Sequence, residues 1–180
     1  QNGIDEVARS FYQTVVNHLQ DPSIKIGIGR PGSDLNQIPQ KVKEAKQAVL
    51  LTDLLSVTNS IVHYSDLGIN GILLEMMEHG MNLEEIYVRK LGPLLNTHQR
   101  QGTDLLKTLT AYLENNQNLQ QTAKSLFIHR HTLKYRLQQI EKKMGIDLNH
   151  AENRLFLEFS LKAYSLLKYL KEEQQKSDFL

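Results

Sequence analysis

Two short helical segments separated by a tight junction, between Asn118 and Gly145, constrain the fold of this chain more than any other feature. The first segment carries Leu119, Ala123 and Leu126 at helical spacing, and the small side chain of Ala123 lets a second helix approach closely. The second segment continues the apolar face, after Ile128 at the corner, with Leu133, Leu137, Ile140 and Met144. The pattern predicts two helices that cross at a turn of about three or four residues.

The side of the second helix opposite this apolar arc is polar and basic. At about 100° per residue, the positions facing away from the arc hold His131, Tyr135, Gln138 and Lys142. The positions that flank them hold Arg130, Thr132, Lys134 and Arg136. Residues 118–144 contain six Lys and Arg residues and one acidic residue, Glu141, in a chain whose formal net charge is only +1. Basic charge is therefore concentrated on this segment, as in proteins that bind nucleic acid.

A helix of this kind suits the major groove of DNA, because Arg, Lys and Gln can bind base edges or phosphates. We expect base or backbone contacts chiefly from Arg130, His131, Lys134 and Tyr135. We expect phosphate contacts from Thr122, Lys124, Arg136 and Lys142. His129, Thr132 and Gln138 complete the predicted DNA-binding set, with His129 also suited to be the N-cap or turn residue. A solvated basic surface helix is the plainer interpretation of the charge alone.

The first third of the chain alternates helical and strand patterns. Val7, Phe11, Val15 and Leu19 recur at helical spacing until the Asp21–Pro22 break. Strand patterns follow at residues 23–29 and 60–64, and between them Asn36 is a plausible N-cap for a helix ending near Leu55. This order predicts a β-α-β core.

Only helical patterns follow Gly68, and Gly92–Pro93 and Gly102–Thr103 are expected to separate helices. We therefore expect an α+β chain with three parts. These are a partial α/β module at residues 1–68, a helical connector at 69–101 that includes an acidic helix at 83–95, and an all-helical DNA-binding domain at 102–180. The last helix, residues 151–173, has two apolar seams. One would cover the helix pair, and the other could meet a second subunit or the preceding helices.

The segment TAKSLFIHRHTLKYRL, residues 122–137, resembles the Fis-type helix-turn-helix and, more closely, the C-terminal domain of the PucR/CdaR family of bacterial transcription regulators. The flanking LLKTLTAYLENNQNL and MGIDL segments extend the resemblance. Upstream, IKIGIGRPGSDLNQIPQKVKEAKQAVLL and IVHYSDLG resemble the second half of a degenerate GGDEF-like domain. The resemblance implies a sequence-specific DNA-binding regulator, with an effector sensed upstream of this fragment. Symmetry favours a homodimer on an inverted repeat, with half-sites about 10 bp or a multiple apart.

The chain departs from this pattern in two ways. Many helix-turn-helix turns have Gly where this chain has Phe127, so we expect either a positive φ or a reshaped turn, with the Phe127 ring packed inward. No Gly-Gly-Asp/Glu-Glu-Phe loop occurs in the sequence, so the resemblance does not imply cyclase activity.

Other functional classes are less well supported. The GIGRPG segment at residues 27–32 fits the G-x-G-x-x-G pattern, but Pro31 and the late helix start favour a plain glycine turn over a dinucleotide site. The seven histidines form no metal-binding spacing, and His63 is expected to be structural. No catalytic motif is present, so we expect no enzyme and no cofactor.

The remaining expectations concern where the protein acts and with what. The chain has no Cys and no apolar run of membrane length, which favours a cytoplasmic protein without membrane contact. Its start, QNGIDEVARS, suggests an internal cut with part of the protein missing upstream. Two alternatives to DNA binding stay open: a helical protein-interaction module and a small-molecule sensor.

Overall fold

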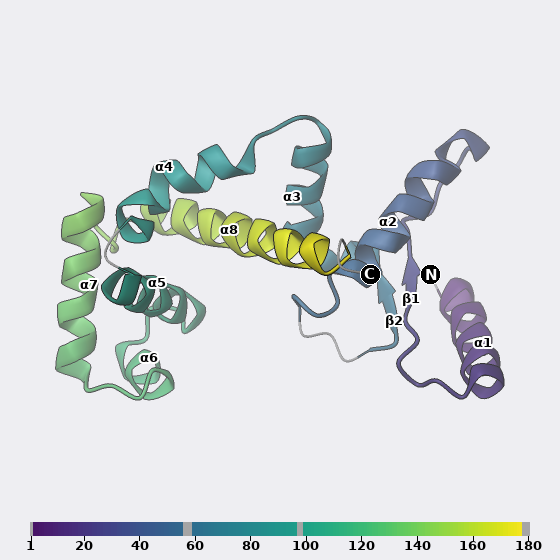
Figure 1. The fold of residues 1–180 in the computed structure, drawn as a ribbon, viewed down its shortest axis with the longest axis horizontal. Helices are drawn as coiled ribbons and strands as arrows, with labels where there is room; N and C mark the ends of the chain where they lie inside the picture. Colours follow the sequence, from purple (N-terminus) through teal and green to yellow (C-terminus); the bar gives the residue numbers. More distant parts are fainter. Residues whose placement is uncertain (1, 56–58, 97–98, 178–180) are drawn as a thin grey trace. The chain divides into compact units, whose positions relative to one another are not determined.

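The computed structural model describes residues 2–55, 59–96 and 99–177. The chain divides into two compact units, residues 1–75 and 76–180 (Figure 1). The first unit holds α1 (Asn2–Leu19), β1 (Ile26–Ile28), the 3-10 helix η1 (Leu35–Gln37), α2 (Ile38–Leu50), β2 (Ile61–His63) and the 3-10 helix η2 (Tyr64–Leu67). The helix α3 (Ile69–Glu78) spans the division. The second unit continues with α4 (Leu83–Leu95), α5 (Gln99–Glu114), α6 (Leu119–Ser125), α7 (Arg130–Met144) and α8 (Ala151–Ser177).

The first unit contains the predicted β-α-β core. β1 and β2 pair in parallel, with Ile26 opposite Ile61 and Ile28 opposite His63, and α2 packs against β1. These elements are shorter than expected. Each strand has three residues, and α2 ends at Leu50 instead of near Leu55. The predicted N-cap, Asn36, was wrong: it lies inside η1, whose N-cap is Asp34. The Asp34 carboxylate accepts a hydrogen bond from the Asn36 backbone N–H at 3.0 Å, and Pro39 lies in the first turn of α2.

The glycines of the GIGRPG segment allow α2 to contact the backbone of the strand directly. A Cβ atom at Gly27 would lie 1.9 Å from the carbonyl oxygen of Ala45, and one at Gly29 would lie 2.3 Å from that of Lys41. No side chain fits at either distance. The close contact between helix and strand accounts for these two glycines without any bound nucleotide.

A buried ion pair joins the end of β1 to α2. The Glu44 side chain is fully buried (0% exposed), and it accepts hydrogen bonds from the Arg30 backbone N–H at 2.8 Å and from Arg30 Nη2 at 2.9 Å. Lys41 Nζ donates to the same carboxylate at 3.1 Å. Burial would raise the pKa of Glu44, but the hydrogen bonds from Arg30 and Lys41 outweigh it and hold the pKa below its ordinary value. The carboxylate is therefore charged at neutral pH and anchors the loop after β1.

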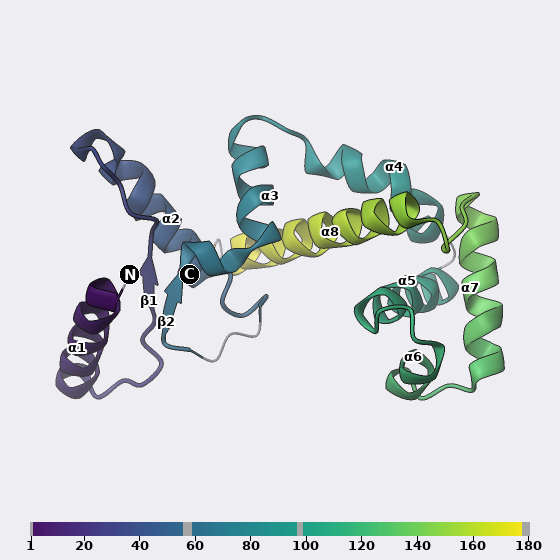
Figure 2. The same ribbon diagram turned by 180° about the vertical axis from the view of Figure 1, so that it is seen from behind.

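The described residues of the second unit form helices and turns only. Figures 1 and 2 show α8 lying alongside α4, where Tyr87 and Tyr164 make an edge-to-face contact with ring centroids 5.2 Å apart. The buried face of α4 includes Leu83, Leu91 and Leu94, so this helix is part of the packed core of the unit.

Two expected helix junctions lie inside helices instead. Gly92–Pro93 belongs to α4, and Gly102–Thr103 lies near the beginning of α5. The predicted division at residues 1–68, 69–101 and 102–180 differs from the two compact units and stays a prediction about domains of the whole protein.

We predict that Gly27→Ala destabilises the first unit. The new methyl group would meet the α2 backbone, so helix and strand must separate, and overpacking of this kind costs about 2–4 kcal/mol in unfolding free energy. Urea unfolding followed by amide hydrogen exchange of residues in β1 and α2 would measure the loss. Gly3→Ala is the matched control, because nothing lies within 4 Å of a Cβ at Gly3. Equal stability of Gly27→Ala and wild type would contradict the close contact.

Candidate functional site

The predicted pair of crossing helices is α6 and α7, at residues 119–144. Asn118 caps α6, and its side-chain oxygen accepts hydrogen bonds from the backbone N–H groups of Gln120 and Gln121 at 3.0 and 3.1 Å. Ala123 is buried at the contact with α7, as its small size suggested. On α7, three of the four expected core residues are buried: Leu133, Leu137 and Ile140. Met144 is half-buried.

His129 is the N-cap of α7, as predicted. Its Nδ1 atom accepts a hydrogen bond from the His131 backbone N–H at 3.3 Å. The rings of His129 and His131 stack, with centroids 5.3 Å apart and planes 7° from parallel. Both side chains are exposed, so the beginning of α7 presents two imidazoles to solvent.

The outer side of α7 is exposed along the helix. Tyr135 is 62% exposed. The other exposed members of the predicted DNA-binding set on this helix are Arg130, His131, Thr132, Lys134, Gln138 and Lys142. Lys124, on α6, is exposed as well. The structure thus brings most of the predicted residues onto the solvent side of one helix pair.

The cations of this surface are available for a partner. Within the described residues, Lys124, Arg130, Lys134 and Lys142 form no ion pair with an acidic side chain. Glu141, the one acidic residue of α7, faces the loop after the helix, where its Oε1 accepts the Leu148 backbone N–H at 2.9 Å. The surface therefore combines uncompensated positive charge with aromatic and amide hydrogen-bonding groups.

Two predicted phosphate-binding residues have other partners. Thr122 is fully buried (0% exposed), and its hydroxyl donates to the carbonyl oxygen of Asn118 at 2.8 Å. Arg136 is half-buried, with Nη1 donating to Thr108 Oγ1 at 3.3 Å and Nη2 lying 3.5 Å from Asp104 Oδ2. Thr122 has no surface to offer DNA, so we leave it out of the proposed contacts. Arg136 ties α7 to α5.

The prediction that Phe127 packs inward was wrong. The residue has a φ of 53°, so the positive φ considered from the sequence is present, but the side chain is 95% exposed. Large aromatic residues are usually buried, so Phe127 was expected in the core. The sequence does show that Phe127 stands where many helix-turn-helix turns have Gly. It does not show in which direction the Phe127 ring points.

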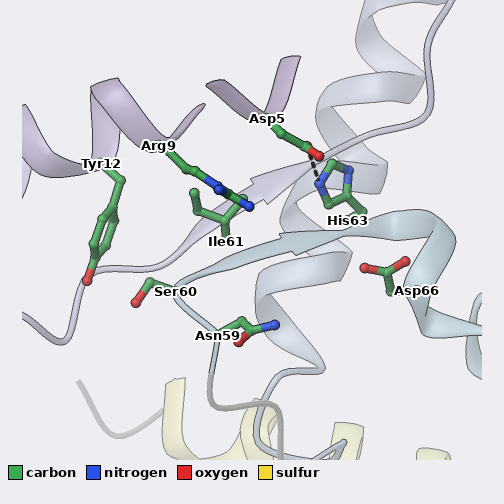
Figure 3. Close-up of a pocket in the computed structure, with 8 residues that line it drawn as sticks. All are labelled: Asp5, Arg9, Tyr12, Asn59, Ser60, Ile61, His63 and Asp66. Atoms are coloured by element: carbon green, nitrogen blue, oxygen red, sulfur yellow. Dashed lines mark ion pairs between the residues drawn. The ribbon is translucent and has the colours of Figure 1, made fainter. Parts of the chain in front are cut away.

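The first unit contains a polar pocket of about 370 Å³ (Figure 3). His63, expected to be structural, lies in its wall, and His63 Nε2 is 2.9 Å from Asp5 Oδ1, a contact that links β2 to α1. Arg9 has no ion-pair partner among the described residues. The pocket is lined by Asp5, Arg9, Tyr12, Asn59, Ser60, Ile61, His63 and Asp66. This pocket could not be predicted from the sequence, because its residues are scattered and match no motif.

None of the helices in the described part of the chain is both long and apolar enough to span a membrane.

Comparison with known proteins identifies a PucR C-terminal helix-turn-helix domain at residues 105–163, a range that contains α6 and α7. The chain is 30% identical to the proline-responsive transcriptional activator PutR of Bacillus subtilis over 168 residues, which are 89% of this chain and 41% of that protein. It is 28% identical to the purine catabolism regulatory protein of the same species over 156 residues, which are 87% of this chain and 29% of that protein.

A third relative is the carbohydrate diacid regulator of Escherichia coli, 29% identical over 137 residues, which are 76% of this chain and 34% of that protein. The chain thus spans less than half the length of each of these curated relatives. Residues 105–163, which hold the helix pair with its exposed basic helix, form a PucR C-terminal helix-turn-helix domain, and the relatives that match most of the chain are transcription regulators of the PucR/CdaR family.

Proposed function

We propose that this chain binds double-stranded DNA sequence-specifically, with α7 in the major groove, and that the protein regulates transcription. The observation that supports the proposal is that the two sides of α7 differ in burial and in charge. One side is buried through Leu133, Leu137 and Ile140, and the opposite side is exposed and basic. A helix held in this way can enter the groove without losing its packing.

The exposed residues divide into two roles. Arg130, His131, Lys134 and Tyr135 lie on the first half of α7, the part of a recognition helix that approaches base edges, so we assign base or backbone contacts to them. Lys124 lies in the last turn of α6 and Lys142 in the last turn of α7, and we assign phosphate contacts to them. Thr132 and Gln138 add hydrogen-bonding groups on the same exposed side, and His129 lies at its beginning.

Several properties of the whole protein belong to the same proposal. We propose a cytoplasmic homodimer that binds an inverted repeat and responds to an effector through a part upstream of this fragment, with no catalytic activity. We also propose that the β-α-β core is the second half of a GGDEF-like module. The parallel β1–β2 pair with α2 packed on it supports this assignment.

Selection from a pool of random duplex DNA, with the purified chain at near-physiological salt, tests the central proposal. We expect one motif to be enriched, as an inverted repeat if the chain dimerises. A pool that stays random, with the chain shown to be folded, would contradict sequence-specific binding and favour the protein-interaction alternative.

We predict that Lys142→Ala weakens binding to all duplexes alike. Loss of one phosphate contact releases one counterion fewer, so the slope of log K against log salt concentration becomes shallower by about one unit. Lys124→Ala is expected to act in the same way. Binding titrations at four or more salt concentrations would measure the slopes.

Lys171→Ala is the control for these variants. Lys171 lies late in α8, where its Nζ pairs with Glu84 Oε1 at 3.3 Å, and that end of α8 extends away from α7 (Figures 1 and 2). The control should keep the wild-type slope. Unchanged slopes for both Lys124→Ala and Lys142→Ala would remove these residues from the interface.

The pocket of the first unit favours a second candidate function, the binding of a small carboxylate. Arg9, which has no ion-pair partner among the described residues, presents a guanidinium that suits a carboxylate, while Tyr12, Asn59 and Ser60 provide hydrogen-bonding groups around it. Two relatives are named for proline and for carbohydrate diacids, and both kinds of compound carry carboxylates. Such a site would let the first unit sense a metabolite directly.

We predict that Arg9→Gln abolishes carboxylate binding in this pocket. L-proline and D-glucarate are the probes, and an increase in the melting temperature of the wild-type chain with either one is the expected signal. Because Arg9 is exposed and makes no ion pair within the described part of the chain, the variant should melt like wild type without ligand. If neither probe shifts the wild-type chain, or if the shift survives in Arg9→Gln, this second function is contradicted.

A further inference from the structure

The turn between α6 and α7 has a backbone geometry that glycine normally provides. The Ile128 N–H donates to the carbonyl oxygen of Ala123 at 3.0 Å, and the Phe127 N–H donates to that of Lys124 at 3.2 Å. These two bonds define a Schellman motif, in which the residue after the helix cap adopts positive φ. Here that residue is Phe127, with a φ of 53°.

Within the described residues, the same pair of hydrogen bonds ends two other helices, α3 and α5. In α3 the corresponding residue is Gly80, at a φ of 81°. In α5 the residue is Asn116, at 50°. Glycine and asparagine are the residues that tolerate this conformation best. Phe127 is the exception, and it is also the only apolar residue among the four non-glycine residues with positive φ in the described ranges.

Packing of the Phe127 ring within the chain does not offset the strain of the positive φ. At 95% exposed, the ring is the most exposed large hydrophobic side chain of the described residues. The position therefore carries two costs in the free protein, a strained backbone and an apolar ring in water. A strained backbone and an exposed apolar side chain at one position are expected where that side chain binds a partner.

The neighbours of Phe127 indicate what that partner is. Exposed cations lie three residues to either side of it, Lys124 on α6 and Arg130 at the first residue of α7. The ring is thus placed at the beginning of the helix to which we assign DNA contacts, between two groups suited to phosphates. A flat apolar ring beside phosphate contacts matches the deoxyribose and thymine-methyl surfaces of a groove edge.

We infer that Phe127 is a DNA contact, packing its ring against deoxyribose or a thymine methyl at the edge of the major groove. This inference rests on the proposed function of α7. An apolar protein partner is the competing occupant, and the flanking cations favour DNA over it. The ring would become buried only in the complex with DNA. Its burial there would offset the backbone strain at Phe127.

The variant Phe127→Gly tests this inference, because it should change stability and DNA affinity in opposite directions. Removing the strain should raise the melting temperature of the free chain by about 2–6 °C. Removing the ring should weaken binding to the selected duplex by about 5- to 30-fold. No charge is lost, so the salt slope should stay at the wild-type value.

Two further variants separate the ring from the backbone. Phe127→Leu keeps an apolar side chain at the same φ and should retain most of the affinity. Leu155→Ala removes another exposed apolar side chain, 69% exposed on α8, and should leave DNA affinity unchanged. Melting curves and binding titrations with the selected duplex provide both readouts for every variant.

The binding and melting results for wild type and Phe127→Gly distinguish failure of the Phe127 contact from failure of the proposed DNA binding. A wild-type chain that binds no duplex overturns both. A wild-type chain that binds, together with Phe127→Gly binding equally well, overturns the Phe127 contact alone and points to a protein partner. A loss of affinity accompanied by a lower melting temperature would mean that the ring supports the turn, and would also overturn the contact.

Discussion

The burial of one side of α7 against α5 and α6 is the interaction on which the proposed DNA-binding surface depends. An isolated helix of 15 residues with this many polar side chains is marginal in water. Leu133 and Ile140 are fully buried, and each contributes about 1.5–3 kcal/mol by leaving water. The Arg136 contacts with Asp104 and Thr108 add a directional link to α5. Packing thus both forms the helix and determines which side faces outward.

Much of this architecture could be predicted from the sequence, because periodicity reports which side of a helix is buried. The spacing of Leu133, Leu137 and Ile140 placed the exposed side of α7 correctly, and His129 was recognised as its cap. The β-α-β order followed from alternating patterns in the first third, and the structure adds that the two strands pair in parallel. Boundaries were less accurate: Pro93 lies within α4, although proline usually marks a helix end.

Individual side-chain partners could not be predicted in the same way. Thr122 looked like a polar surface residue, yet its hydroxyl bonds back to Asn118 within the helix and allows full burial. Arg136 was expected to bind a DNA phosphate. Its acidic partner, Asp104, lies 32 residues away in sequence and becomes adjacent to it only through folding. The pocket around Arg9 is built from α1 and β2 in the same long-range manner. Such contacts depend on tertiary structure, which local patterns do not contain.

The turn between α6 and α7 is closed by main-chain hydrogen bonds from the N–H groups of Phe127 and Ile128. Its shape therefore does not depend on the identity of the side chain at position 127. Evolution can exchange that side chain while the angle between the two helices is maintained, at a cost limited to local stability. The position is a place where related proteins can diverge in what they recognise without having to rebuild the domain that recognises it.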